Sequence, residues 1–157
     1  WAVAAAGGVT VGALVAVNAL GDVLDERGAV LAGARAPAGH PRFPAARPPT
    51  AVVAEHTVIG CLVTDALLSK PEAARAADLA HSGVARAVSP AHTTFDGDAL
   101  FLLCAQRLPA SVDLVADLGA RAVAGAIRAA VRHAQAIPGV PADPRAARPA
   151  GSPSRGC

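Results

Sequence analysis

Thr57 is the residue whose position first points to chemistry. It opens the β-branched stretch TVIGCLVT, directly after a segment rich in proline. A threonine hydroxyl is a weak nucleophile unless a base takes its proton, and the residue's own α-amine becomes that base once the preceding peptide bond is cut. An α-amine has an ordinary pKa of about 8, so it accepts protons near neutral pH. On spacing alone, Thr57 is more simply a β-branched strand residue.

Asp96 and Asp98, in the stretch FDGD, form a second candidate group. Alternate residues of an extended chain point to the same side, so the two carboxylates can converge on one site. Gly97 between them lets the loop approach closely, although a DGD stretch is also typical of an Asx-type turn. Three polar residues just upstream either line a pocket or bond their own backbone: His92, Thr93 and Thr94.

The composition argues against a nucleic-acid partner and describes an unusual core. The chain has 157 residues, 53% of them hydrophobic and only 3% aromatic, with a net charge of +2. So small a charge gives no electrostatic case for binding nucleic acid. A core of Ala, Val, Leu and Gly brings little area per residue, so it needs close packing or help from other chains.

The three cysteines predict neither a metal site nor a disulfide framework. Cys61 and Cys104 lie in apolar runs and Cys157 is the last residue. No CxxC or Cys/His ligand spacing is present in the sequence. We therefore expect a reduced, cytoplasmic protein. A threonine nucleophile needs no metal, so no cofactor is expected either.

The first 20 residues are almost free of charge, which raises the question of a membrane helix. Their glycines, and the Val and Leu residues gathered between Val9 and Leu20, favour a buried strand, so no membrane partner is expected. The chain begins at Trp1 in the middle of a pattern, and we expect that upstream sequence is missing.

The pattern of apolar and turn residues predicts an α/β fold with a mixed or antiparallel sheet covered by helices. Strands are expected at Val9–Leu20, Ala29–Ala34, Thr57–Thr64 and Leu100–Ala105. The turn 25–28 would join the first two strands as a hairpin. A capping box predicts a helix over 69–88, and Ser111 caps a second helix that ends near residue 137. A Pro-rich linker, 36–55, and a disordered tail, 141–157, lie outside these elements.

Three stretches together resemble the P1 (S58) peptidase family. They are VGALVAVNALGDV (Val11–Val23), HTVIGCLVTDA (His56–Ala66) and AHSGVARAVSPAHTTFDGDALF (Ala80–Phe101). The family includes L-aminopeptidase/D-esterases, β-peptidyl aminopeptidases and nylon-oligomer hydrolases. The resemblance implies a four-layer α-β-β-α sandwich of the N-terminal-nucleophile type, shared with ornithine acetyltransferases. It also implies a precursor that cuts itself before a Ser or Thr into an α chain and a β chain.

By position, Thr57 matches the nucleophile of that family, and the bond cut would be His56–Thr57. Residues 1–56 would then be the C-terminal part of the α-chain region, and 57–140 the β-chain region of the same domain. The family commonly has Asn or Gly where this sequence has His56. Many relatives have a second Thr where it has Val58.

The resemblance also assigns roles to Asn18, Asp96 and Asp98. Asn18 matches the asparagine whose side-chain amide points at the oxyanion; without the family, a satisfied core amide is the simpler interpretation. Asp96 and Asp98 match an acidic pair that orients the terminal amine of the nucleophile.

The resemblance implies a self-processing aminopeptidase or amidohydrolase. Its substrates would be small peptides or amides with a free amine, and its αβ units would form homo-oligomers. Two alternatives stay open. One is an acyl transferase like ornithine acetyltransferase, and the other is a degenerate, uncleaved member with a structural role.

Overall fold

The computed structural model describes residues 1–33, 56–94, 96–138 and 142. The Pro-rich linker 36–55 lies outside the described residues, as does the tail 141–157 apart from Ala142. The main sheet has the strand order β1-β2-β5-β7. Its strands are β1 (Ala2–Ala6), β2 (Val9–Asn18), β5 (Thr57–Leu67) and β7 (Ala99–Pro109). β2 pairs antiparallel with β1 and β5, whereas β5 and β7 are parallel, so the sheet is mixed as expected.

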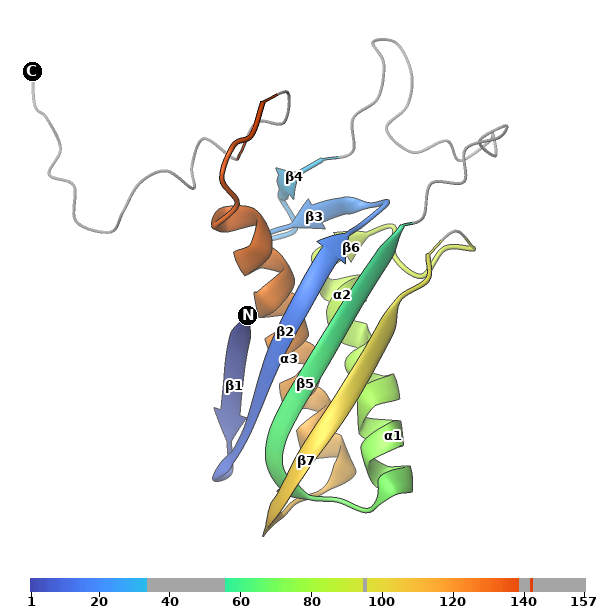
Figure 1. Cartoon of the computed structure of the whole chain (residues 1–157), viewed down its shortest axis with the longest axis vertical. Coiled ribbons are helices and arrows are strands. Elements are labelled where there is room, and N and C mark those ends of the chain that lie inside the picture. Colours follow the sequence, from blue (N-terminus) through green and yellow to red (C-terminus); the bar gives the residue numbers. More distant parts are fainter. Residues whose placement is uncertain (34–55, 95, 139–141, 143–157) are drawn as a thin grey trace, which may run out of the picture.

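Three helices cover one face of this sheet (Figure 1). They are α1 (Lys70–Ala80), α2 (Ser82–Ala87) and α3 (Val112–Arg132). Alternate residues of β5 point toward them and are buried, and the central residue Leu62 packs in one core with Leu118 and Ile127 of α3. A methyl group at Gly119 would lie 3.0 Å from Leu62 Cδ2. The aromatic-poor core is therefore closely packed, as its composition requires.

The predicted helix starts are confirmed, but the predicted continuous helix over 69–88 is wrong. Glu72 accepts hydrogen bonds from the backbone N–H and the hydroxyl of Ser69, at 2.8 and 2.6 Å. The first helix ends at His81, α2 follows, and Val88–Ser89 forms the short strand β6. The break accompanies a close contact between α2 and α3, because a methyl group at Gly83 would overlap the Ala120 backbone.

The predicted hairpin has the right turn and the wrong partner. The Asp25 carboxylate accepts the backbone N–H groups of Arg27 and Ala29 and closes the turn. However, β4 (Val30–Ala32) pairs with β3 (Asp22–Leu24) and not with β2, which ends at Asn18. β3 also pairs with β6, giving a second sheet of order β4-β3-β6 at one end of the molecule (Figure 1). At Gly21, between β2 and β3, a methyl group would overlap the Ser89 and Pro90 backbone, so glycine is needed for the two segments to approach this closely.

The sheet face opposite the helices is apolar and exposed. Its large side chains include Leu14, Ile59, Val63, Phe101 and Leu103, the last two being 59% and 60% exposed. Among the described residues, no second sheet covers this face, so they form one helical layer on one main sheet. The four-layer arrangement stays a prediction. None of the helices in the described ranges is both long and apolar enough to cross a membrane.

Candidate active site

The register between β2 and β5 brings two of the predicted site residues together. Asn18, the last residue of β2, is directly opposite Thr57, the first residue of β5. Both belong to the alternation that faces away from the helices, as do Ala16 and Ile59, the next pair on the same face of the sheet. Opposite residues of an antiparallel pair have Cα atoms about 4.5–5.5 Å apart. A side-chain amide on Asn18 and a hydroxyl on Thr57 are therefore neighbours on one surface.

The loop before β7 reaches the same end of the sheet, because parallel strands begin at the same edge. His56 and Asp96 form an isolated parallel bridge just ahead of the two strands. The backbone N–H of Gly97 donates to the carbonyl oxygen of His56 at 3.0 Å. A methyl group at Gly97 would lie only 3.2 Å from Thr57 Oγ1. The loop thus lies directly against the His56–Thr57 peptide and the Thr57 hydroxyl.

Asp98 ties this loop to the beginning of β5. Its Oδ1 accepts the backbone N–H of Val58 at 2.8 Å. Its Oδ2 lies 3.2 Å from Nδ1 of His92, and its side chain is only 6% exposed. A buried carboxylate needs such partners, because an unpaired charge away from water is costly.

Asp96 and Asp98 have different hydrogen-bond partners. Its Oδ2 accepts the backbone N–H of Thr93 at 2.7 Å, while its own N–H donates to the Thr93 carbonyl at 3.1 Å. This reciprocal pair closes a turn within the loop. The structure therefore gives the two carboxylates separate partners, with Asp98 at the strand and Asp96 in the loop turn.

Three histidines lie in this region: His56, His81 and His92. Among the described residues, the buried Nδ1 of His56 has no hydrogen-bond partner. Nε2 of His92 lies 3.2 Å from the carbonyl oxygen of His81, and their rings are 5.6 Å apart. Burial lowers the pKa of His81, and the charge of His92 lowers it further. Sequence spacing gave no signal for this contact, and Thr94, also predicted near the site, is exposed.

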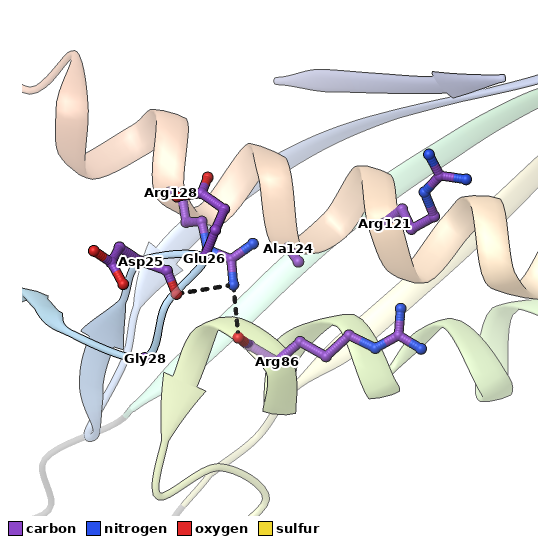
Figure 2. A pocket seen from close by; sticks show the side chains of 7 residues that line it. All are labelled: Asp25, Glu26, Gly28, Arg86, Arg121, Ala124 and Arg128. Atoms are coloured by element: carbon purple, nitrogen blue, oxygen red, sulfur yellow. Dashed lines mark hydrogen bonds between the residues drawn. The ribbon is translucent and has the colours of Figure 1, made fainter.

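A separate cavity of about 440 Å³ lies between the 25–28 turn, α2 and α3 (Figure 2). Its lining includes Arg86, Arg121 and Arg128, and none of the predicted site residues. Arg128 donates to the carbonyl oxygens of Leu24 and Arg86 at 2.9 and 2.8 Å. These bonds fasten the β3–β4 hairpin and α2 to α3, so we interpret the arginine as structural.

Comparison with known proteins agrees with the three sequence stretches. Residues 2–143 match peptidase family S58. A Mycobacterium leprae protein named an uncharacterized aminopeptidase is 32% identical, over 85% of this chain and 43% of its own length. Similarly named proteins of Mycobacterium bovis and Mycobacterium tuberculosis are 35% identical, over 85% of this chain and 47% of theirs. The chain thus spans less than half the length of these relatives. Because the family match covers most of the chain, this protein belongs to peptidase family S58.

Proposed function

We propose that this chain carries the nucleophile of a self-processing aminopeptidase or amidohydrolase, and that it is cut between His56 and Thr57. One observation carries the proposal. The His56 carbonyl oxygen already accepts a backbone hydrogen bond from Gly97, and the Thr57 hydroxyl lies against the same glycine. The carbonyl that would be attacked and the attacking hydroxyl therefore share one neighbour.

The cleavage follows from these contacts. Thr57 Oγ attacks the carbonyl carbon of His56, and the oxygen of that carbonyl becomes negative. The Gly97 N–H, 3.0 Å away, stabilises this charge, as backbone donors do in an oxyanion hole. The C–N bond then breaks, the hydroxyl proton passes to the leaving nitrogen, and an ester joins His56 to Thr57 Oγ. Water hydrolyses the ester, releasing residue 56 with a carboxylate and Thr57 with a free amine.

After cleavage the same groups serve hydrolysis of a substrate amide. The free amine of Thr57 takes the hydroxyl proton, and the oxygen attacks the substrate carbonyl. Asn18, opposite Thr57 in the sheet, donates its side-chain N–H to the new oxyanion. Asp98 holds the N–H of Val58 and so fixes the backbone directly after the nucleophile, while Asp96 holds the loop.

The exposed apolar sheet face supports the wider architecture that we propose. A patch that includes Leu14, Val63 and Phe101 is unusual on a surface that stays in water. A second sheet packed on this face would give the four-layer sandwich and would place new walls beside Thr57. Such walls would select small peptides or amides with a free amine. We further propose that the αβ units form homo-oligomers. We also propose that the protein resides in the cytoplasm, where cysteines such as Cys61 and Cys104 stay reduced.

The test is intact mass spectrometry of the complete gene product, carried out for the wild type, Thr57→Ala and Thr57→Ser. We expect two fragments that separate before Thr57 in the wild type, none in the alanine variant, and slower cutting in the serine variant. The cut protein should then hydrolyse aminoacyl amides. One uncut chain in all three proteins would refute self-processing and favour an uncleaved member with a structural role.

A further inference from the structure

His92 is placed so that both of its ring nitrogens face oxygen atoms. Nε2 lies 3.2 Å from the carbonyl oxygen of His81, which can only accept a hydrogen bond. Nδ1 lies 3.2 Å from Oδ2 of Asp98. An ionised carboxylate also only accepts, so the ring satisfies both contacts when both nitrogens carry hydrogen.

The backbone of His92 is held in an uncommon conformation. Its φ of 55° lies in the left-handed region, which few residues other than glycine adopt, although Asn, Asp and His adopt it more often than the rest. The cis peptide Ser89–Pro90 lies in the same connection between α2 and β7. The two ring contacts anchor His92 at both ends, to His81 at the end of α1 and to Asp98 before β7.

Within the part of the chain that the structure describes, the Asp98 carboxylate contacts the His92 ring and the backbone N–H of Val58. The other acidic group of the loop, Asp96, bonds to Thr93 instead. Burial, and then the charge of His92, lowers the pKa of the neighbouring His81 ring. One carboxylate oxygen of Asp98 thus depends on His92, and the other orients the residue after Thr57.

We propose that His92 is a positioning residue of the reaction. It holds the Asp98 carboxylate through Nδ1, and Asp98 in turn holds Val58 and the start of β5 where Thr57 can react. His92 itself touches neither the cleaved bond nor substrate. This inference rests on the proposed function, because the reaction that it supports is the one proposed for Thr57.

A matched pair of variants separates the two ring contacts. In His92→Asn the amide nitrogen replaces Nδ1, so it can donate to Asp98 but cannot reach the His81 carbonyl. In His92→Gln the amide nitrogen replaces Nε2, so it keeps the His81 contact and loses the Asp98 contact. Displacement of reacting groups by about 1 Å can cost about 100-fold in rate. We expect the Gln variant to lose about 10- to 100-fold in self-cleavage rate and kcat, with KM little changed, and the Asn variant to keep most of both.

The experiment uses the complete gene product, with cleavage followed by intact mass and hydrolysis by release of amine. His133→Gln is the control, since His133 is exposed at the end of α3. Equal rates in the Asn and Gln variants, or a slower Asn variant, would overturn the positioning role even though the wild type cuts itself. A wild type that stays uncut would instead refute the proposed function, and the role of His92 would fall with it.

Discussion

Gly97→Ala tests the contact between the loop and the Thr57 hydroxyl directly. The added methyl group would lie 3.2 Å from Thr57 Oγ1 and 4.0 Å from the His56 carbonyl oxygen. The first distance is tighter than nine in ten real Cβ contacts, so the hydroxyl or the loop must move by a few tenths of an ångström. The φ of Gly97 lies outside the left-handed region, and the residue is exposed, so the backbone accepts alanine. The stability should therefore change by no more than about 0.5 kcal/mol.

The effect on reactivity should be larger than the effect on stability. A displacement of about 1 Å costs about 100-fold in rate, so a shift of a few tenths corresponds to a loss of roughly 3- to 10-fold. The assay is a time course of self-cleavage in the complete gene product, quenched with acid and read as the uncut fraction by intact mass.

Gly12→Ala is the control for this experiment. Its methyl group would meet Val3 Cγ2 at 3.9 Å and the Val63 carbonyl oxygen at 4.0 Å, which are ordinary contacts on the same sheet. We expect it to cut at the wild-type rate. If Gly97→Ala folds normally and also cuts at the wild-type rate, the Thr57 hydroxyl does not react from the position described here.

Three further predictions concern the packing, the acid stability and the oxyanion. Gly83→Ala should destabilise the protein by about 1–3 kcal/mol, because the methyl group overlaps the Ala120 backbone; an unchanged urea midpoint would contradict this. Arg132 binds the Glu26 carboxylate at 2.6 and 3.0 Å and lowers the pKa of Glu26 from 4.5 to about 2. The stabilisation is therefore present above pH 4.5 and is lost as the pH falls toward 2. Glu26→Gln should remove this dependence from the melting temperature. Asn18→Ala should lower kcat by about 10²–10³, and a loss confined to KM would exclude the oxyanion role.

The parts of the fold that the sequence predicted depend on local signals. The strand at Thr57 and the helix starts at Ser69 and Ser111 follow from β-branched runs and capping residues, and each is present. The errors involve partners distant in sequence. The β4 strand could not be assigned to β3 from its turn alone, and strand β1, rich in alanine, has no local strand signal. The break after α1 accompanies a contact between Gly83 and the Ala120 backbone of α3, which helical periodicity does not predict.

In the candidate site, too, local signals were readable from the sequence and contacts between distant residues were not. The DGD stretch marked Asp96 and Asp98 as a pair, but the sequence could not say that only Asp98 reaches the strand. That contact joins residues 40 apart in the chain and exists because β5 and β7 are parallel. The contact between His92 and His81 depends on where α1 ends, which the sequence placed too late.

The assembly of the site follows from two pairings of a single strand. β2 is antiparallel to β5, so the end of β2 meets the start of β5 and Asn18 lies opposite Thr57. β7 is parallel to β5, so both strands start at the same edge and the loop with Gly97 and Asp98 lies there too. A slip of one residue in β5 would turn Thr57 to the helix-covered face and expose Val58, which is buried. The cost of exposing Val58 and the other buried residues of β5 therefore fixes the register. The register in turn determines which face of the sheet carries the Thr57 hydroxyl and which residues lie beside it. Packing of the apolar residues behind the sheet is thus what holds Thr57 in front of it.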